Sequence, residues 1–204
     1  LGFGVETMME QNQFWALSRM RIDIDSFPGY GSEVMVTTWP KSRDKFFAYR
    51  DLTLSKNDTV FARATSSYAL VDIKSRRPIP LDSMPDSISL HNQHAIEDHA
   101  IKIEFNKGEN VKLIQVENMD LDVHRHVNNI KYLDWAVNTL PLKYWYGNQV
   151  SRVEINFLRE LWVENEIELH WTLDNNTLKV CGKTLGKDAF RVVLTMKARE
   201  FSKP

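Results

Sequence analysis

Alternating hydrophobic and polar residues occupy two stretches of the chain that resemble each other. Residues 18–39 (SRMRIDIDSFPGYGSEVMVTTW) and residues 151–171 (SRVEINFLRELWVENEIELHW) both begin with Ser-Arg, pass through a short break and end in Trp. Alternation with a period of two predicts a half-buried β-strand on each side of the break. Because the repeat is far longer than the roughly 50 residues of a solenoid unit, it indicates two copies of one domain.

A helix is predicted near the start of each copy. Hydrophobic residues at spacings of three, four and three predict a helix over residues 129–140, with one face formed by Ile130, Leu133, Val137 and Leu140. A less regular pattern predicts the first helix over residues 5–17. Strands rich in Val, Ile, Phe, Tyr and Thr follow each helix, and a helix followed by antiparallel strands is an α+β arrangement.

The two copies set the expected domain boundaries. Residues 1–80 form the first domain and residues 104–204 the second, with residues 81–103 as a connector that has no regular period. A strand over residues 111–118 is predicted before the second helix. The matching strand of the first copy would fall before residue 1, so we expect the first domain to lack its first strand.

Composition narrows the functional classes. The 204 residues are 43% hydrophobic, which is enough for one large core or for two cores of about 100 residues each. The net charge of −1 argues against a general nucleic-acid binder. No apolar run approaches the roughly 18 residues that span a bilayer, so a membrane is not an expected partner either. The single cysteine, Cys181, excludes an internal disulfide and fits a reducing cytoplasm, which is the expected location.

Titratable side chains are concentrated between the predicted strand and the second helix, in residues 120–135 (DLDVHRHVNNIKYLDW). If residues 120–127 are extended, Asp122, His124 and His126 share one face of the chain. The hydrophobic residues between them, Val123 included, are then expected to pack on the other face.

This pattern supports three hypotheses. The first is a polar loop that only caps the helix, with Asn128 or Asn129 as the N-cap. The second is acid–base catalysis, with His126 as the base and Asp122 orienting its partners. The third is a divalent metal site, because His-x-His is a ligand spacing and a carboxylate could complete the set.

The same stretch resembles a motif of the acyl-[acyl-carrier-protein] (acyl-ACP) thioesterases of plants and bacteria. DLDVHRHVNN is similar to the family pattern Asp-Leu-Asp-Val-Asn-x-His-Val-Asn-Asn. Two further stretches, FWALSRMRIDIDSFPGYGSEVMVTTWP and ARATSSYALVDIKSRRPIPL, resemble family segments in the same order. The resemblance covers essentially the whole chain and favours a bacterial member. It implies a tandem hotdog fold, in which an antiparallel sheet wraps a long helix in each domain.

The resemblance also implies catalytic roles. The family hydrolyses the thioester between a fatty acyl chain and the phosphopantetheine arm of acyl carrier protein, and we expect no cofactor and no metal. The family's catalytic Asp, Asn and His fall on Asp122, His124 and His126, and a further Glu falls on Glu160. Where the family has a Cys after that Glu, this chain has Leu161, so water attack is expected instead of a cysteine nucleophile. His124 stands in for the family Asn, and we expect it to orient its neighbours rather than act as the base.

Substrate and partner contacts are predicted on both domains. The expected substrate contacts are Trp15, Met20, Trp39, Phe46, Asn128 and Asn129. Between Lys41 and Arg77, nine Lys or Arg residues and four Asp residues give a balance of +5, which leaves −6 for the rest of the chain. We expect this basic segment to contact the acidic acyl carrier protein through Lys74, Arg76 and Arg77.

Two other functions stay open at this point. One is hydrolysis of acyl-CoA, and the other is non-catalytic binding of acyl thioesters by the same fold. Asp122, His126 and Glu160 favour an enzyme, because a protein that only binds the thioester needs no group that activates water. The sequence leaves open whether the chain forms a homo-oligomer.

Overall fold

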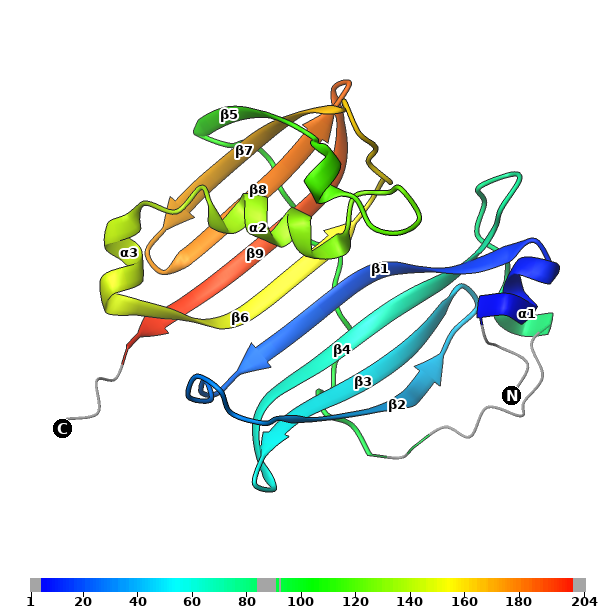
Figure 1. Cartoon of the computed structure of the whole chain (residues 1–204), viewed down its shortest axis with the longest axis horizontal. Helices are drawn as coiled ribbons and strands as arrows, with labels where there is room; N and C mark the ends of the chain where they lie inside the picture. The colour runs from blue at the N-terminus through cyan, green and yellow to red at the C-terminus, as the bar shows by residue number, and fades with distance from the viewer. Residues whose placement is uncertain (1–4, 84–90, 92, 200–204) are drawn as a thin grey trace. The chain divides into compact units, whose positions relative to one another are not determined.

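The structure is a computed structural model that describes residues 5–83, 91 and 93–199. The chain divides into two compact units, Leu1–Ile101 and Lys102–Pro204, and the division falls inside the predicted connector. Each unit is built on antiparallel strands, which confirms the predicted α+β class (Figure 1).

The first unit contains four long strands within its described residues. The short helix α1 (Val5–Glu10) is followed by β1 (Gln13–Ile24), β2 (Met35–Arg43), β3 (Phe47–Lys56), β4 (Thr59–Asp72) and the 3-10 turn η1 (Leu81–Ser83). The strands are ordered β2-β3-β4-β1, and each neighbouring pair is antiparallel.

The second unit contains five strands and two α-helices within its described residues. Its elements are β5 (Asn110–Gln115), the 3-10 turn η2 (Asn118–Asp120), α2 (Asn129–Val137), α3 (Leu142–Gly147), β6 (Asn148–Phe157), β7 (Glu166–Asp174), β8 (Thr177–Thr184) and β9 (Lys187–Ala198). The strands are ordered β6-β9-β8-β7-β5, again antiparallel.

The two units repeat the same connectivity, as the sequence repeat predicts. In each, the first long strand pairs with the fourth, the fourth with the third and the third with the second. The hairpin between the third and fourth strands also recurs, with positive φ at both loop residues: Asn57 and Asp58 in the first unit, Leu185 and Gly186 in the second. Such two-residue turns match the right-handed twist of paired strands.

The predicted first helix is largely wrong. α1 ends at Glu10, Asn12 adopts a φ of 56°, and residues from Gln13 onward pair with β4. The aromatic residues Phe14 and Trp15 favour a strand, and they pair with Val71 and Leu70 of β4. The second predicted helix is correct but shorter, since α2 ends at Val137 and Asn138 caps it.

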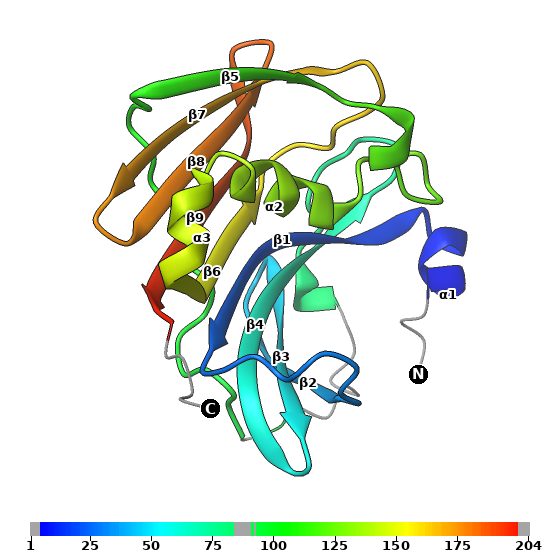
Figure 2. The ribbon, with the colours of Figure 1, turned by 60° about the vertical axis from the view of Figure 1, so that its left-hand side comes forward.

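α2 covers one face of the second unit's sheet (Figure 2). The ring of Tyr132 meets Phe157 of β6 and Phe190 of β9 edge to face, at centroid distances of 5.4 and 5.1 Å. Phe190 in turn lies over Gly182 of β8, where any Cβ would collide with its ring. Glycine is therefore required at position 182 for the ring that supports α2.

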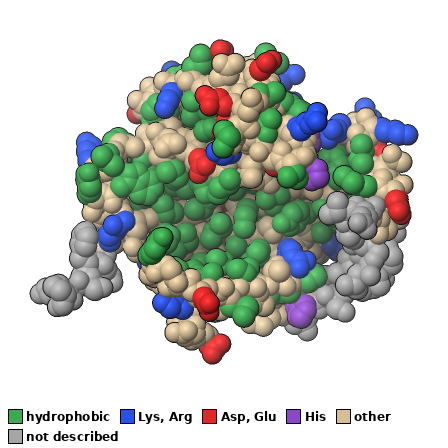
Figure 3. All heavy atoms as spheres, viewed as in Figure 1, with side chains coloured by type: hydrophobic (Ala, Val, Ile, Leu, Met, Phe, Trp, Pro, Cys, Tyr) green, Lys and Arg blue, Asp and Glu red, His purple; other side chains and the backbone are tan. Residues whose placement is uncertain are grey.

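A bulge in β1 decides which side chains share a face of the first sheet. The register shifts between Leu17 and Arg19, so that Trp15 lies opposite Leu70 and Met20 opposite Ser66. Simple alternation would place Trp15 and Met20 on opposite faces, whereas the bulge puts both on the same face. Hydrophobic side chains gather over the visible face of this sheet in Figure 3.

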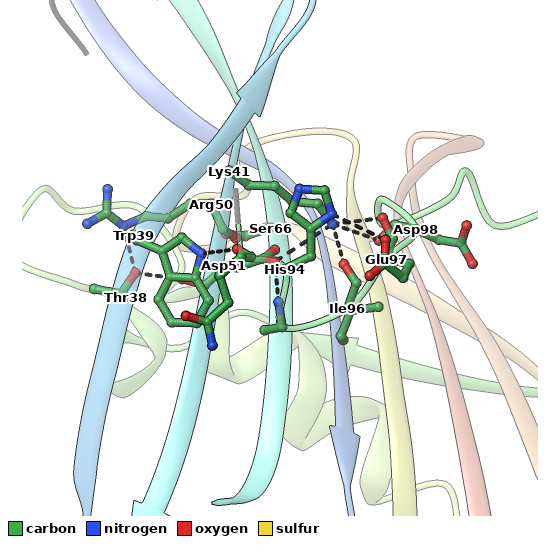
Figure 4. Close-up of polar contacts among 12 residues, drawn as sticks. Thr38, Trp39, Lys41, Arg50, Asp51, Ser66, His94, Ile96, Glu97 and Asp98 are labelled. Atoms are coloured by element: carbon green, nitrogen blue, oxygen red, sulfur yellow. Dashed lines mark hydrogen bonds and ion pairs between the residues drawn. The ribbon is translucent and has the colours of Figure 1, made fainter. Parts of the chain in front are cut away.

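The opposite face of the first sheet is polar and lies under residues 93–98. The ammonium of Lys41 donates to the backbone carbonyls of residues 96–98, and it lies 3.7 Å from the carboxylate of Asp51 (Figure 4). Asp51 accepts the amide proton of Ala95 at 2.7 Å, and the indole of Trp39 donates to Gln93 at 2.7 Å. These bonds hold residues 93–98 against the sheet of the first unit.

Candidate active site

Residues 121–127 form a tight loop that reverses the chain before α2. Leu121 and Val127 form an isolated antiparallel bridge, the amide of Asp122 donates to the carbonyl of His126 at 2.8 Å, and Arg125 has a φ of 64°. The extended backbone expected over residues 120–127 is therefore wrong. Val123, expected to pack, is 91% exposed near the tip of the loop.

The carboxylate of Asp122 holds this loop in shape. Its Oδ1 accepts the amide protons of His124 at 2.8 Å and His126 at 3.2 Å. Short Asp side chains favour this geometry because they can bond to the backbone two residues further on. The Asp-x-His-x-His alternation, which resembles a strand pattern in the sequence, therefore belongs to a turn. In this turn the backbone amides of both histidines donate to the carboxylate of Asp122.

The two histidines of the loop have different surroundings. His126 is half-buried, and its ring meets Trp162 edge to face at a centroid distance of 4.1 Å. His124 is exposed. The packing restricts the ring of His126 to few orientations, as a proton-transfer group requires. Nothing in the local sequence pattern links Trp162 to His126, so this neighbour is apparent only in the structure.

Glu160 belongs to the loop after β6, which lies against the histidine loop. The amide of Val127 donates to the carbonyl of Leu161 at 2.9 Å. Leu161 follows Glu160 and Val127 follows His126, so this bond brings the two segments together. The charges of Glu160 and Asp122 both raise the pKa of Tyr132, after the larger effect of burial. Both carboxylates therefore lie within electrostatic reach of the same phenol.

The start of α2 closes the loop from the other side. Asn128 is the N-cap, and its side-chain oxygen accepts the amide proton of Ile130 at 3.1 Å. Its own amide donates to the carbonyl of Asp120 at 2.8 Å, and Asp120 forms an ion pair with Lys131 at 3.4 Å. The capping role predicted for Asn128 or Asn129 is confirmed for Asn128, and Asn129 is the first residue of the helix.

Neither Cys181 nor Leu161 can supply a nucleophile. Cys181 lies in β8 with no exposed surface, and burial, followed by the charge of Asp188, raises the pKa of its thiol to about 12. Thiolates are the reactive form of cysteine, so this thiol is inert near neutral pH. Leu161, at the position of the family cysteine, is fully buried and hydrophobic.

The substrate contacts expected in the first unit do not form one cluster. Trp15 and Met20 are partly exposed on one face of the sheet, and Trp15 packs against the Met8–Leu70–Leu81 core. Trp39 lies on the opposite face beneath Gln93. Phe46 is 41% exposed in the turn between β2 and β3. Only Trp15 and Met20 share a surface.

The expected docking residues lie in the turn that follows β4. Lys74, Arg76 and Arg77 are all exposed, and the guanidinium of Arg76 lies 5.5 Å from the ring centroid of Phe14. Asp72 stabilises the turn by accepting from the amide and hydroxyl of Ser75. The turn thus presents three cations to solvent on a fixed backbone.

Two further findings concern the hypothesis of a metal site and the possibility of membrane-spanning helices. Within residues 5–83, 91 and 93–199, no three His, Cys, Asp or Glu side chains come together as a metal-binding group. The strand geometry on which the His-x-His hypothesis depended is also missing, because the histidines lie in a turn. Every helix in the described ranges is too short or too polar to traverse a bilayer.

Family models match both halves of the chain in succession. The acyl-ACP thioesterase N-terminal domain matches residues 1–88, and the acyl-ACP thioesterase C-terminal domain matches residues 103–188. Among curated proteins, the chain is 27% identical to a chloroplastic palmitoyl-acyl carrier protein thioesterase of Gossypium hirsutum, covering 86% of this chain and 46% of that protein. It is 26% identical to a chloroplastic dodecanoyl-[acyl-carrier-protein] hydrolase of Cinnamomum camphora, covering 82% and 47%. The chain thus spans less than half the length of these relatives.

Solved structures show the same fold. An acyl-ACP thioesterase from Bacteroides thetaiotaomicron superposes with a TM-score of 0.84 at 23% identity, over 96% of this chain and 82% of that one. The 12:0-ACP thioesterase from Umbellularia californica gives a TM-score of 0.84 at 21% identity, over 97% and 80%. At identities of 23% and 21%, the structural similarity establishes the fold and nothing further.

Proposed function

The chain belongs to the acyl-ACP thioesterase family, with the family's tandem hotdog fold, and from that membership we propose that it hydrolyses fatty acyl-ACP thioesters to free fatty acid and carrier protein. The observation that carries the proposal is the bond from Val127 to Leu161, with the packing of His126 on Trp162. Together they bring the loop with His126 beside the loop with Glu160.

Water is the proposed nucleophile. His126, with Glu160 sharing the role, takes a proton from water as its oxygen bonds to the thioester carbonyl carbon. The tetrahedral intermediate then collapses, the carbon–sulfur bond breaks, and the proton passes to the departing pantetheine sulfur. Asp122 keeps the loop in shape through the amides of His124 and His126.

The start of α2 is the proposed site for the developing oxyanion. A helix N-terminus carries positive partial charge and amide donors, which stabilise negative charge that forms during the reaction. The amides of Ile130 and Lys131 bond to Asn128, so we assign this role to the amide of Asn129. Asn128 then acts as the support that fixes the helix start.

Release of free fatty acid from a panel of thioesters tests the proposal. We expect acyl-ACP substrates to give a kcat/KM at least about tenfold above that of the matching acyl-CoA, a difference of roughly 1.4 kcal/mol. Equal or better turnover of acyl-CoA would make the chain an acyl-CoA thioesterase. Tight binding of acyl-ACP without release of fatty acid would make it a binding protein.

The basic turn after β4 is the proposed docking surface for the carrier protein. Lys74, Arg76 and Arg77 are exposed on it, and an acidic partner is attracted to such a cluster. Reversal of two of these charges, Arg76→Glu with Arg77→Glu, should raise KM for acyl-ACP several-fold and leave KM for acyl-CoA nearly unchanged. The effect should shrink at high salt, because exposed charges are screened beyond about 8 Å at physiological ionic strength.

A matched control carries the same change in net charge elsewhere. Lys179→Glu with Lys187→Glu reverses two exposed charges in the second unit and should leave KM for acyl-ACP unaltered. If this control raises KM as much as the pair at 76 and 77, net charge governs the encounter and the docking surface is misplaced.

Three expectations from the sequence stay predictions. They are the bacterial origin, the cytoplasmic location and the domain limits at residues 80 and 104. The carrier protein as partner is part of the proposal above.

A further inference from the structure

Four side chains at the centre of the first sheet's polar face form a square. Asp51 and Tyr49 alternate along β3, Thr65 and Ser67 alternate along β4, and the register places Asp51 opposite Thr65 and Tyr49 opposite Ser67. Side chains directly opposite each other have Cβ atoms about 4.5–5.5 Å apart, and residues two apart on a strand are separated by about 6.5 Å. All four side chains therefore border one small area of the sheet, on the face to which residues 93–98 are bonded.

This area is covered on the side away from the sheet. Lys41 and Asp51 lie 3.7 Å apart under the carbonyls of residues 96–98, with almost no exposed side-chain surface (Figure 4). The ring of Tyr49 is stacked on the ring of His99 at a centroid distance of 3.6 Å. The Thr and Ser side chains of β4 are shorter than these neighbours, and both are closed off from solvent.

Three oxygen atoms that border this area have no hydrogen-bond partner within the described residues. They are Asp51 Oδ1, Thr65 Oγ1 and Ser67 Oγ, and their residues are 0%, 0% and 1% exposed. Buried polar side-chain atoms in folded proteins nearly always have a partner, because an unpaired atom has lost its hydrogen bonds to water without replacement. A fourth such atom, Ser42 Oγ, lies opposite Tyr49 on the side away from Ser67, so the unpaired oxygens gather on this one face.

The chemistry of the three oxygens selects the kind of ligand that fits them. An ionised carboxylate only accepts hydrogen bonds, whereas a hydroxyl can both donate and accept. A ligand among them must therefore donate to Asp51 and also bond to hydroxyls, as water does, and about three polar partners are typical of a buried water. An anion would be repelled by Asp51. A cation would add a second positive charge beside Lys41, which already neutralises that carboxylate.

We propose that the polar face of the first sheet binds an internal water molecule between β3 and β4, held by Asp51 Oδ1, Thr65 Oγ1 and Ser67 Oγ. The carboxylate of Asp51 then accepts the amide of Ala95 through one oxygen and the water through the other. The water is thus part of the contact that holds residues 93–98 on the sheet. The inference concerns the first unit alone and does not depend on thioester hydrolysis.

Magnetic relaxation dispersion of ¹⁷O in the full chain tests this site, because its amplitude reports the number of long-lived internal waters. Thr65→Val with Ser67→Ala removes both hydroxyls with little change of shape, and the amplitude should fall by about one water. Ser66→Ala is the matched control. Ser66 lies in the same strand and is 1% exposed, but its hydroxyl donates to the carbonyl of Arg50 at 3.0 Å, so the amplitude should stay unchanged.

Amide exchange at Ala95 gives a second readout. The double variant leaves Asp51 Oδ1 buried without a donor, so this amide should exchange about tenfold faster, whereas Thr65→Ser keeps a hydroxyl and should behave like the wild type. An unchanged dispersion amplitude in the double variant would overturn the inference, and so would an equal fall in Ser66→Ala. An amplitude that depended on whether the buffer held sodium or potassium would replace the water by a cation.

A crystal structure of the wild-type chain tests the same site without any substitution. It should show an ordered water within about 3.2 Å of all three oxygens. A direct hydrogen bond between Thr65 and Asp51, with no water beside them, would refute the proposal.

Discussion

Replacement of His126 by Asn is expected to lower kcat for acyl-ACP by about 10²- to 10⁴-fold, the usual contribution of a positioned acid–base group. His126 is half-buried, its ring packs on Trp162, and the neighbouring Val127 bonds to the Glu160 loop. Asn can occupy similar space but cannot take a proton from water. Turnover of acyl-ACP under saturating substrate measures the effect, with circular dichroism as a check on folding.

His124→Asn is the matched control for this prediction. His124 is in the same loop, is exposed, and contributes its backbone amide to Asp122. The substitution restores the residue found in the family motif and leaves that amide in place, so most of the activity should remain. If the two variants were equally inactive while still folded, His126 would not be the base, and the roles of the two histidines would have to be reassigned.

Replacement of Asp51 by Ala is expected to reduce the free energy of unfolding by about 3–5 kcal/mol, the usual cost of removing one partner of a buried ion pair. Asp51 and Lys41 have almost no exposed side-chain surface, and Asp51 also accepts the amide of Ala95. Without the carboxylate, a buried ammonium loses its counter-charge and Ala95 loses its acceptor. Denaturant unfolding followed by tryptophan fluorescence measures the change.

An exposed ion pair in the same unit provides the comparison. Asp25 pairs with Arg63, and the two side chains are 58% and 39% exposed. Asp25→Ala should change stability by less than about 1 kcal/mol, as is typical of surface pairs. A loss at Asp51 no larger than the loss at Asp25 would mean that the polar cluster beneath residues 93–98 adds little to stability.

The sequence predicted two α+β copies because hydrophobic alternation is a local signal, whereas the order of the strands in each sheet is apparent only in the structure. The turns at Asn57-Asp58 and Leu185-Gly186 occupy matching positions in the two units. The helix expected over residues 5–17 is largely wrong for a reason that local patterns do not show: Gln13–Leu17 pair with residues of β4 that lie more than 50 residues further along the chain. Pairing over that distance overrides a weak helical period.

At the candidate site, the residue types could be predicted from the sequence, but the backbone conformation and the contacts between distant residues could not. The residue types around His126 pointed to acid–base chemistry, but the strand expected for them is a turn, since the carboxylate of Asp122 bonds to the amides of the residues that follow. The contact of Trp162 with His126 is formed only in the folded chain, because the two residues are distant in the sequence. Charge counting was misleading at Lys41 and Asp51, which belong to the basic segment by sequence but are buried against each other. A count of charges cannot distinguish a solvated residue from a buried one.

Insertions and deletions should be tolerated unequally along β1. Loss of the extra residue at the bulge between Leu17 and Arg19 would leave Gln13–Leu17 opposite the same residues of β4, so their side chains would keep their faces. One residue inserted between Trp15 and Leu17 would instead turn every side chain from Gln13 to Trp15 to the other face. Trp15 would then leave its hydrophobic core and enter the polar face, although no amino acid had been substituted. Selection on this strand therefore acts on its length as well as its composition, and a library that varies side chains at constant length explores a safer set of variants than one that permits gaps.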